Sequence, residues 1–153
     1  MKKPFVNKAL EELILVKEAV KLDTIEVLHC SQFNAYKYLH DSGCYGVVNN
    51  KQMMRMFRFA LAAYVNSLWV GCAIVFLDVV HSNNAYIMGI NGESIDIQVE
   101  LLKKVDEVCR IMAFSSMQLS KNIKHTVVIG AFNKNRLPDE SFRLEKGSLF
   151  RRF

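Results

Sequence analysis

The sequence predicts one α+β domain spanning residues 1–153, with a mixed, mainly antiparallel sheet and flanking helices. Asn91-Gly92 separates two runs of strand-forming residues, and this dipeptide supplies the two positive φ angles of a tight hairpin turn. After residue 100 the apolar residues no longer recur at every second position but at every third or fourth, which indicates a helix. Residues 125–132 are almost continuously apolar, as in a strand buried on both faces.

Helices are expected in the first part of the chain. Each candidate has apolar residues at helical spacing, and Ser31 and Ser42-Gly43 are suitable N-terminal and C-terminal caps for the second one. Residues 24–29 fit a strand or a helix equally well. The predicted helices cover residues 5–22, 31–41 and 51–65.

A three-stranded antiparallel meander is predicted over residues 68–99, followed by a helix and a further strand. A helix between two strands brings those strands, here 93–99 and 125–132, into parallel neighbouring positions. The chain then closes with a hairpin around Lys146-Gly147 or, alternatively, with a short helix. The predicted strands are 68–80, 85–90, 93–99 and 125–132, the helix is 101–112, and the hairpin spans 142–153.

Composition excludes several classes of protein. The chain has 4 Cys without CxxC spacing, which argues against a disulfide scaffold or a zinc box and favours reduced thiols in the cytoplasm. The apolar stretch Phe59–Val80 is long enough, at ~20 residues, for a membrane-spanning helix. Asn66-Ser67 interrupts this stretch, and its second half is rich in β-branched residues, so we expect a strand after residue 67 and no membrane span.

The order of elements resembles the GNAT superfamily of acyl-CoA N-acyltransferases, in which a meander leads into a helix and then a parallel strand. The similarity covers residues 66–153 in the main and is greatest to divergent GNAT-like proteins encoded by bacteriophages. The segments that carry it are Ala63–Phe76 for the second strand pair, Glu93–Ile97 for the fourth strand and Ser141–Phe153 for the closing hairpin.

Active members of this superfamily hold the CoA pyrophosphate on a glycine-rich loop between the fourth strand and the next helix. At the matching place, Gln98–Lys103 has no Gly, and Glu100 adds a negative charge. The resemblance therefore implies a domain without a cofactor, a structural or protein-binding module such as a phage virion or accessory protein. Its alternative is an active acyltransferase that holds acetyl-CoA through Lys103 and Lys104.

The sequence offers weak candidates for catalysis. His81 and Glu93 lie at opposite edges of the predicted meander and suit a general base with an orienting carboxylate. Polar residues at exposed turns explain the same pair more simply. Cys30 precedes a predicted helix, where a thiol pKa falls, but the sequence places no general base beside it. The scattered His and Cys residues predict no metal site.

The positive charge is concentrated at the C-terminus. Residues 121–153 hold eight Lys or Arg and three acidic residues, interleaved with Phe. Such a segment can contact a protein partner, mediate self-assembly or, as a further alternative, bind nucleic acid. A basic surface that contacts only solvent is the simpler explanation, because such surfaces are common. We expect the protein in the cytoplasm, or in a virion if a phage encodes it. The candidate contact residues are Lys134, Arg136, Arg143, Lys146, Arg151 and Arg152.

Overall fold

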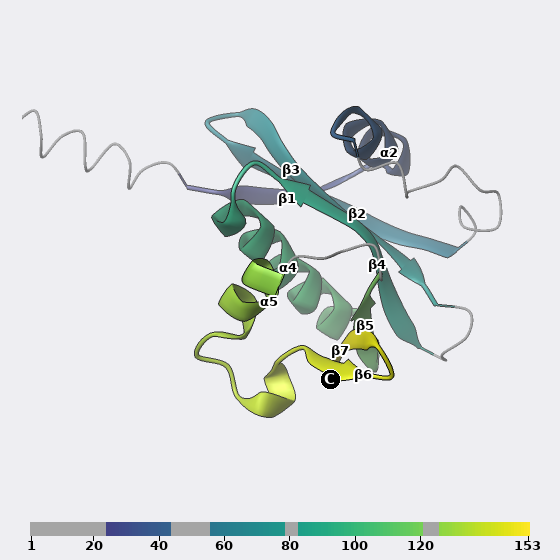
Figure 1. Ribbon diagram of the computed structural model, residues 1–153. Coiled ribbons are helices and arrows are strands. Elements are labelled where there is room, and N and C mark those ends of the chain that lie inside the picture. Colours follow the sequence, from purple (N-terminus) through teal and green to yellow (C-terminus); the bar gives the residue numbers. More distant parts are fainter. Residues whose placement is uncertain (1–23, 44–55, 79–82, 121–125) are drawn as a thin grey trace, which may run out of the picture.

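The computed structural model describes residues 24–43, 56–78, 83–120 and 126–153 (Figure 1). The predicted helix over residues 5–22 lies outside them. In chain order the elements are β1 (Glu26–Cys30), α2 (Gln32–Asp41), β2 (Phe57–Val65), β3 (Leu68–Leu77), β4 (Asn84–Gly92), α4 (Ile95–Ile111), β5 (Ser116–Leu119), α5 (Thr126–Asn133), the 3-10 turn η1 (Pro138–Glu140), β6 (Arg143–Glu145) and β7 (Ser148–Arg152).

The strands form a seven-stranded mixed sheet in the order β1-β2-β3-β4-β5-β7-β6. Among the described strands, β4 and β5 pair in parallel, and the other neighbours pair antiparallel. Helix α4 forms the crossover between β4 and β5. The α+β class and the mixed, mainly antiparallel sheet are therefore confirmed.

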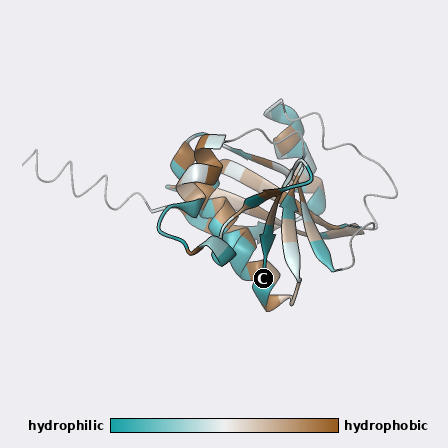
Figure 2. Cartoon of the chain, turned by 60° about the horizontal axis from the view of Figure 1, so that its bottom comes forward, coloured by the Kyte–Doolittle hydropathy of each residue, from teal (hydrophilic) through white to brown (hydrophobic). Residues whose placement is uncertain are grey.

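Helices cover both faces of this sheet. Figure 1 shows α4 and α5 on one face and α2 on the other. Alternate residues of β2 face the two layers: Phe59 and Leu61 join the larger core beneath α4, and Ala60 joins the smaller core beneath α2. The helices in Figure 2 alternate between hydrophobic and hydrophilic colours, as expected for helices with one buried side.

Two predicted elements are confirmed by their local chemistry. Helix α2 begins after Ser31, whose Oγ accepts a hydrogen bond from the Asn34 backbone N–H at 3.1 Å. The closing hairpin β6–β7 turns at Lys146 and Gly147, with φ of 49° and 82°. Both signals depend on side chains and dihedral preferences within a few residues, so the surrounding fold does not alter them.

The predicted helix over residues 51–65 is wrong where the structure describes it, because residues 57–65 form β2. Strands β2 and β3 form a hairpin around Asn66 and Ser67, with φ of 50° and 66°. Pairing with two neighbouring strands overrides the helical propensity of its Ala and Leu residues. The stretch Phe59–Val80 therefore contains two strands, and no helix within the described ranges is both long and apolar enough to cross a membrane.

The predicted hairpin at Asn91-Gly92 is also wrong. These two residues end β4, and residues 95–99 open helix α4. The alternation of Ile95, Ile97 and Val99 suggested a strand, but Ile97 is also the first member of a buried helical row with Leu101 and Val105. The antiparallel meander is consequently β2–β3–β4, residues 57–92, and does not extend to residue 99.

A third correction concerns the parallel strands. The predicted strand 125–132 is wrong, because residues 126–132 belong to helix α5, whose buried Val128, Ile129 and Phe132 lie on one helical side. The strand that pairs in parallel is β5, which joins β4, the predicted 85–90 strand. Strand β5 has four residues, with the sequence SMQL, and carries little apolar pattern of its own.

Ser94 provides a test of the corrected start of α4. Its Oγ accepts a hydrogen bond from the Ile97 backbone N–H at 3.2 Å. We expect Ser94→Ala to lower the free energy of unfolding by about 1 kcal/mol, because a helix N-terminal N–H loses its partner. Urea unfolding measures this loss. The control Ser115→Ala, which removes an exposed hydroxyl, should change stability by less than about 0.5 kcal/mol, and an equal loss in both variants would contradict the assignment.

Candidate functional site

The two parallel strands separate partway along β4. They are paired from Asn84 with Ser116 to Ile87 with Leu119, and the Ser120 N–H then donates to the Ile87 carbonyl at 3.0 Å. Strand β4 continues to Gly92 beside β3, with a bulge at Met88. In open sheets that contain parallel strands, ligands bind beyond the carboxyl ends of those strands. This location makes the end of β4 and the start of α4 the first place to look for a site.

The connection between β4 and α4 consists of Glu93 and Ser94. The Glu93 N–H donates to the Val70 carbonyl at 3.0 Å, and the Gly92 N–H lies 2.9 Å from Asn91 Oδ1. Ser94 Oγ accepts from the Ile97 N–H. Three backbone donors in and beside this connection, those of Gly92, Glu93 and Ile97, are therefore satisfied by groups of the protein itself.

Side chains also close over this connection. A Cβ on Gly92 would lie 2.9 Å from Ile97 Cγ2 and 3.0 Å from Gln98 Cγ, so the helix packs directly on the glycine. Gln98 Nε2 donates to the Gly92 carbonyl at 3.0 Å, while Gln98 Oε1 is buried without a partner in the described part of the chain. Two carboxylates, Glu93 and Asp96, flank the start of the helix, and like charges oppose an anion there.

The predicted cofactor contacts, Lys103 and Lys104, lie inside helix α4 and not at its start. Glu100 is within the second turn of α4 and not at the connection, so the segment Gln98–Lys103 was aligned to the wrong part of the fold. Lys103 pairs with Glu100 at 3.1 Å, and Lys104 pairs with Glu107 at 3.2 Å, all on the solvent side of the helix. Lys103 lines an open surface cavity of about 550 Å³ together with Ile25 and Val99.

The proposed catalytic pair is not brought together by any described contact. His81 lies outside the described residues. Glu93 is exposed, at the connection before α4 and not in a strand. No group of three or more His, Cys, Asp or Glu side chains suited to a metal ion occurs within the described ranges.

The basic C-terminal residues divide into three sets. Arg136 and Arg151 turn toward Asp106, and Arg152 pairs with Glu145 at 2.7 Å. Donation by Arg152 lowers the pKa of the Glu145 carboxyl. The remaining three, Lys134, Arg143 and Lys146, are exposed and form no ion pair with a described residue.

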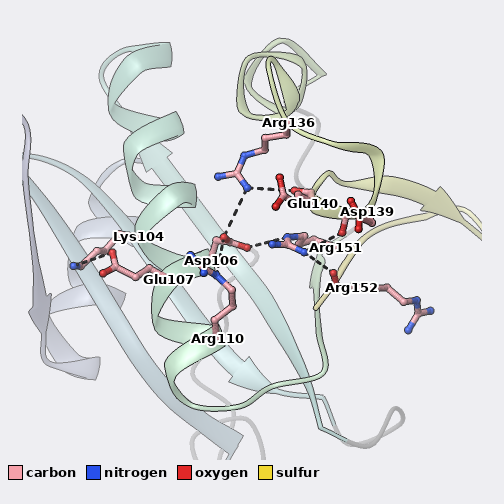
Figure 3. A network of polar contacts seen from close by, with 9 residues as sticks. All are labelled: Lys104, Asp106, Glu107, Arg110, Arg136, Asp139, Glu140, Arg151 and Arg152. Carbon is pink, nitrogen blue, oxygen red and sulfur yellow. Dashed lines mark hydrogen bonds and ion pairs between the residues drawn. The ribbon is translucent and has the colours of Figure 1, made fainter.

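Sequence reasoning missed the most buried charged cluster, which is centred on Asp106 of α4 (Figure 3). The Asp106 side chain is 2% exposed, and Arg151 Nε lies 3.0 Å from its Oδ1. Arg110 and Arg136 approach the other carboxylate oxygen at 3.4 and 3.8 Å. The cluster joins α4 to the C-terminal segment. Asp106 follows buried Leu102 by four residues and is buried on the same side of the helix.

Backbone carbonyls and aromatic rings complete this cluster. Arg151 Nη1 donates to the Asp139 carbonyl at 3.1 Å, and Arg136 Nη1 donates to the Glu140 carbonyl at 3.2 Å. The guanidinium of Arg136 lies 3.9 Å from the centre of the Phe132 ring. Burial and the Asp106 charge together raise the pKa of the Cys109 thiol to about 12. These contacts stabilise the junction between α4 and the C-terminal segment and are not typical of an open binding site.

No model of a protein family matches the chain, and no curated protein does. Solved structures do match. The IAA acetyltransferase from Bacillus cereus superposes with a TM-score of 0.58 at 13% identity, over 85% of this chain and 100% of its own. A GNAT-family acetyltransferase from Staphylococcus aureus gives a TM-score of 0.52 at 12% identity, over 84% and 99%.

The PaiA N-acetyltransferase from Thermoplasma acidophilum, solved in complex with coenzyme A, gives a TM-score of 0.54 at 11% identity, over 85% of this chain and 99% of its own. The chain therefore has a divergent GNAT-like acyl-CoA N-acyltransferase fold, as the order of its elements predicted. At these identities the likeness establishes the fold alone, and the chemistry has to be argued from the site.

Proposed function

We propose that this protein is a GNAT-fold domain that binds no acyl-CoA and acts as a structural or protein-binding module. One observation carries the proposal: only two residues connect β4 to α4, and the N–H groups of Gly92, Glu93 and Ile97 around that connection already donate within the protein.

A diphosphate group needs free N–H donors and a favourable potential at the start of a helix. Here Ser94 caps the helix, and the Ile97 and Gln98 side chains cover Gly92. Glu93 and Asp96 add negative charge where the diphosphate would lie. Because repulsion and the loss of existing hydrogen bonds would both oppose binding, we expect the affinity for CoA to be low.

Acetyl-CoA titration tests this proposal directly. A ligand that binds the native state raises its melting temperature, and at one hundred times its Kd it adds about 2.7 kcal/mol of stability. We expect no rise in melting temperature of the full chain up to millimolar acetyl-CoA. A clear rise at sub-millimolar ligand would overturn the proposal.

Two variants distinguish the two obstacles to CoA binding, the flanking negative charges and the occupied backbone donors. Glu93→Gln combined with Asp96→Asn removes the flanking charges, and any gain in CoA affinity would identify those carboxylates as the obstacle. Glu100→Gln is the matched control, because it removes a charge from the same helix outside the connection. If neither variant binds CoA, the covered backbone donors are the main obstacle.

An active acyltransferase is the second candidate. It is favoured by the separation of parallel strands β4 and β5 and by the fold shared with an acetyltransferase solved with coenzyme A. The titration above distinguishes the two candidates. Transfer of an acetyl group to an amine, measured as release of free CoA thiol, would decide for the enzyme.

The β6–β7 hairpin is the surface we propose for contact with a protein partner or another copy of the chain. Strand β6 is at the edge of the sheet, and Leu144 on it is 71% exposed between Arg143 and the turn residue Lys146. Edge strands accept further strands unless they are protected. A phage virion or accessory protein is the setting that we infer from the sequence resemblance.

Nucleic acid is the less favoured partner. Half of the six candidate basic residues, Arg136, Arg151 and Arg152, are engaged in ion pairs with acidic groups of the protein. Nucleic-acid affinity depends on cations free to neutralise phosphates. Oligonucleotide titration at low ionic strength tests this alternative, and a strong, salt-dependent interaction would favour it.

A further inference from the structure

The outer side of strand β6 presents main-chain groups that the neighbouring strand does not use. Phe142 directly precedes β6, and its N–H donates to Asn133 Oδ1 at 2.9 Å while its carbonyl accepts from Asn133 Nδ2 at 3.1 Å. Successive residues of an antiparallel pair turn these groups alternately toward the neighbouring strand and away from it. The N–H and C=O of Leu144 therefore point away from β7, as those of Phe142 do, and no group of the described residues bonds to them.

Three cations lie around this edge and form no ion pair with a described residue. Arg143 is on β6, and Lys146 is in the turn that follows it. Lys134 follows Asn133 directly, and the contact of Asn133 with Phe142 holds Lys134 near the start of the strand. All three side chains are exposed, so they are available to a partner that carries negative charge.

The carboxylates near the edge are already engaged. Glu145 of β6 binds Arg152, whose Nη2 lies 2.7 Å from Oε1 and whose Nε lies 3.2 Å from Oε2. Asp139 and Glu140 lie with the arginines of the cluster around Asp106 (Figure 3). The cations of the β6 edge are therefore left without carboxylates of their own, and this edge is complementary to an acidic surface.

We propose that the outer edge of β6 binds an acidic, extended segment of another protein by strand addition. This inference rests on the proposed function and names the kind of partner that the β6–β7 hairpin takes. The added strand bonds to the free N–H and C=O of Leu144, and its apolar side chains contact the Leu144 side chain, which is 71% exposed. Its carboxylates pair with Arg143, Lys146 and Lys134.

A second copy of the chain and a nucleic acid fit this edge less well. A second copy brings the same unpaired cations, and like charges oppose the pairing of two strands. The acidic residue of its own β6, Glu145, is already bound by Arg152. A nucleic acid supplies phosphates for the cations, but it has no strand of N–H and C=O groups to pair with the main chain of Leu144.

Titration of the full chain with a short peptide in which glutamate alternates with valine tests strand addition. Because the free edge is short, we expect a Kd of roughly 10–100 μM at low ionic strength. The same peptide with lysine in place of glutamate should not bind. Binding should slow hydrogen exchange of the Leu144 amide, since this N–H becomes bonded to the peptide. No binding of the acidic peptide, or equal binding of the two peptides, would overturn the proposal.

Arg143→Glu tests the charge of the edge. We expect the affinity for the acidic peptide to fall by about fivefold or more, because a carboxylate replaces a cation that faces the carboxylates of the peptide. Lys37→Glu is the matched control, because it reverses one exposed charge on α2 and should leave the affinity unchanged. Circular dichroism confirms that both variants are folded. An equal loss in both would show that net charge alone attracts the peptide, and it would contradict the site.

Leu144→Pro tests the main-chain contact. Proline lacks the N–H, and it is tolerated on an edge strand where that group faces away from the neighbouring strand. Leu144→Ala keeps the N–H and is the matched control. We expect the proline variant to bind the acidic peptide about threefold or more weakly than the alanine variant. Equal affinities of the two folded variants would exclude strand addition.

Sedimentation of the full chain and titration with a single-stranded oligonucleotide test the other two occupants. Self-association at micromolar concentration that Arg143→Glu abolishes, or oligonucleotide binding tighter than that of the acidic peptide, would overturn the proposal. Acetyl-CoA gives an independent result. Stabilisation by acetyl-CoA would contradict the proposed absence of CoA binding, whereas a failure of the acidic peptide to bind would contradict only the strand addition.

Discussion

Asp106→Ala should lower the free energy of unfolding by about 3–5 kcal/mol, the largest loss that we expect from a single substitution in this protein. The variant leaves the Arg151 guanidinium, whose side chain is 7% exposed, without its carboxylate. Water cannot replace that partner easily at a buried position. Equilibrium unfolding in urea, followed by circular dichroism, measures the effect.

The neighbouring Glu107→Gln is the matched control. Its ion pair with Lys104 is exposed, so stability should change by less than about 1 kcal/mol. Replacing both members of the buried pair, as in Asp106→Leu with Arg151→Met, should recover much of the loss, because no uncompensated charge remains. If Asp106→Ala costs no more than Glu107→Gln, the cluster does not stabilise the junction between α4 and the C-terminal segment.

Gly71→Ala should destabilise the protein by about 1–3 kcal/mol through steric overlap. Gly71 lies on β3 where α4 crosses the sheet. A Cβ there would be 2.7 Å from Ile97 Cγ2, 2.9 Å from the Asn91 carbonyl oxygen and 3.1 Å from Leu101 Cδ1. Because the Asn91 carbonyl belongs to the backbone of β4, the helix or the strand has to move. The melting temperature and the urea midpoint both report this loss.

Gly130→Ala is the opposite case and serves as the control. Gly130 is in α5, and a Cβ there would have no neighbour within 4 Å. Alanine is the better helix former by about 1 kcal/mol, so this variant should be neutral or more stable. A similar loss in both variants would show that close packing of α4 against β3 is not the cause.

The candidate site could be predicted from the sequence only in part. The absence of a glycine-rich connection was predicted from Gln98–Lys103, but these residues are inside α4, and the true connection, Glu93 and Ser94, directly follows Gly92. Three of the basic residues predicted as contacts form ion pairs with Asp106 and Glu145, which the sequence did not indicate. Their partners are remote in sequence, since Asp106 precedes Arg151 by 45 residues, and no local pattern indicates such a pair.

The sequence alone determined the elements that carry their own signals: the Ser31 cap of α2, the second half of α4 and the closing turn at Lys146-Gly147. Tertiary contacts decided whether the short apolar segments form a strand or a helix. Residues 57–65 became a strand, and residues 126–133 became a helix. Over eight or nine apolar residues the strand and helix periods are hard to distinguish, so burial against distant partners selects the conformation. Long-range contacts of the same kind brought Arg151 to Asp106.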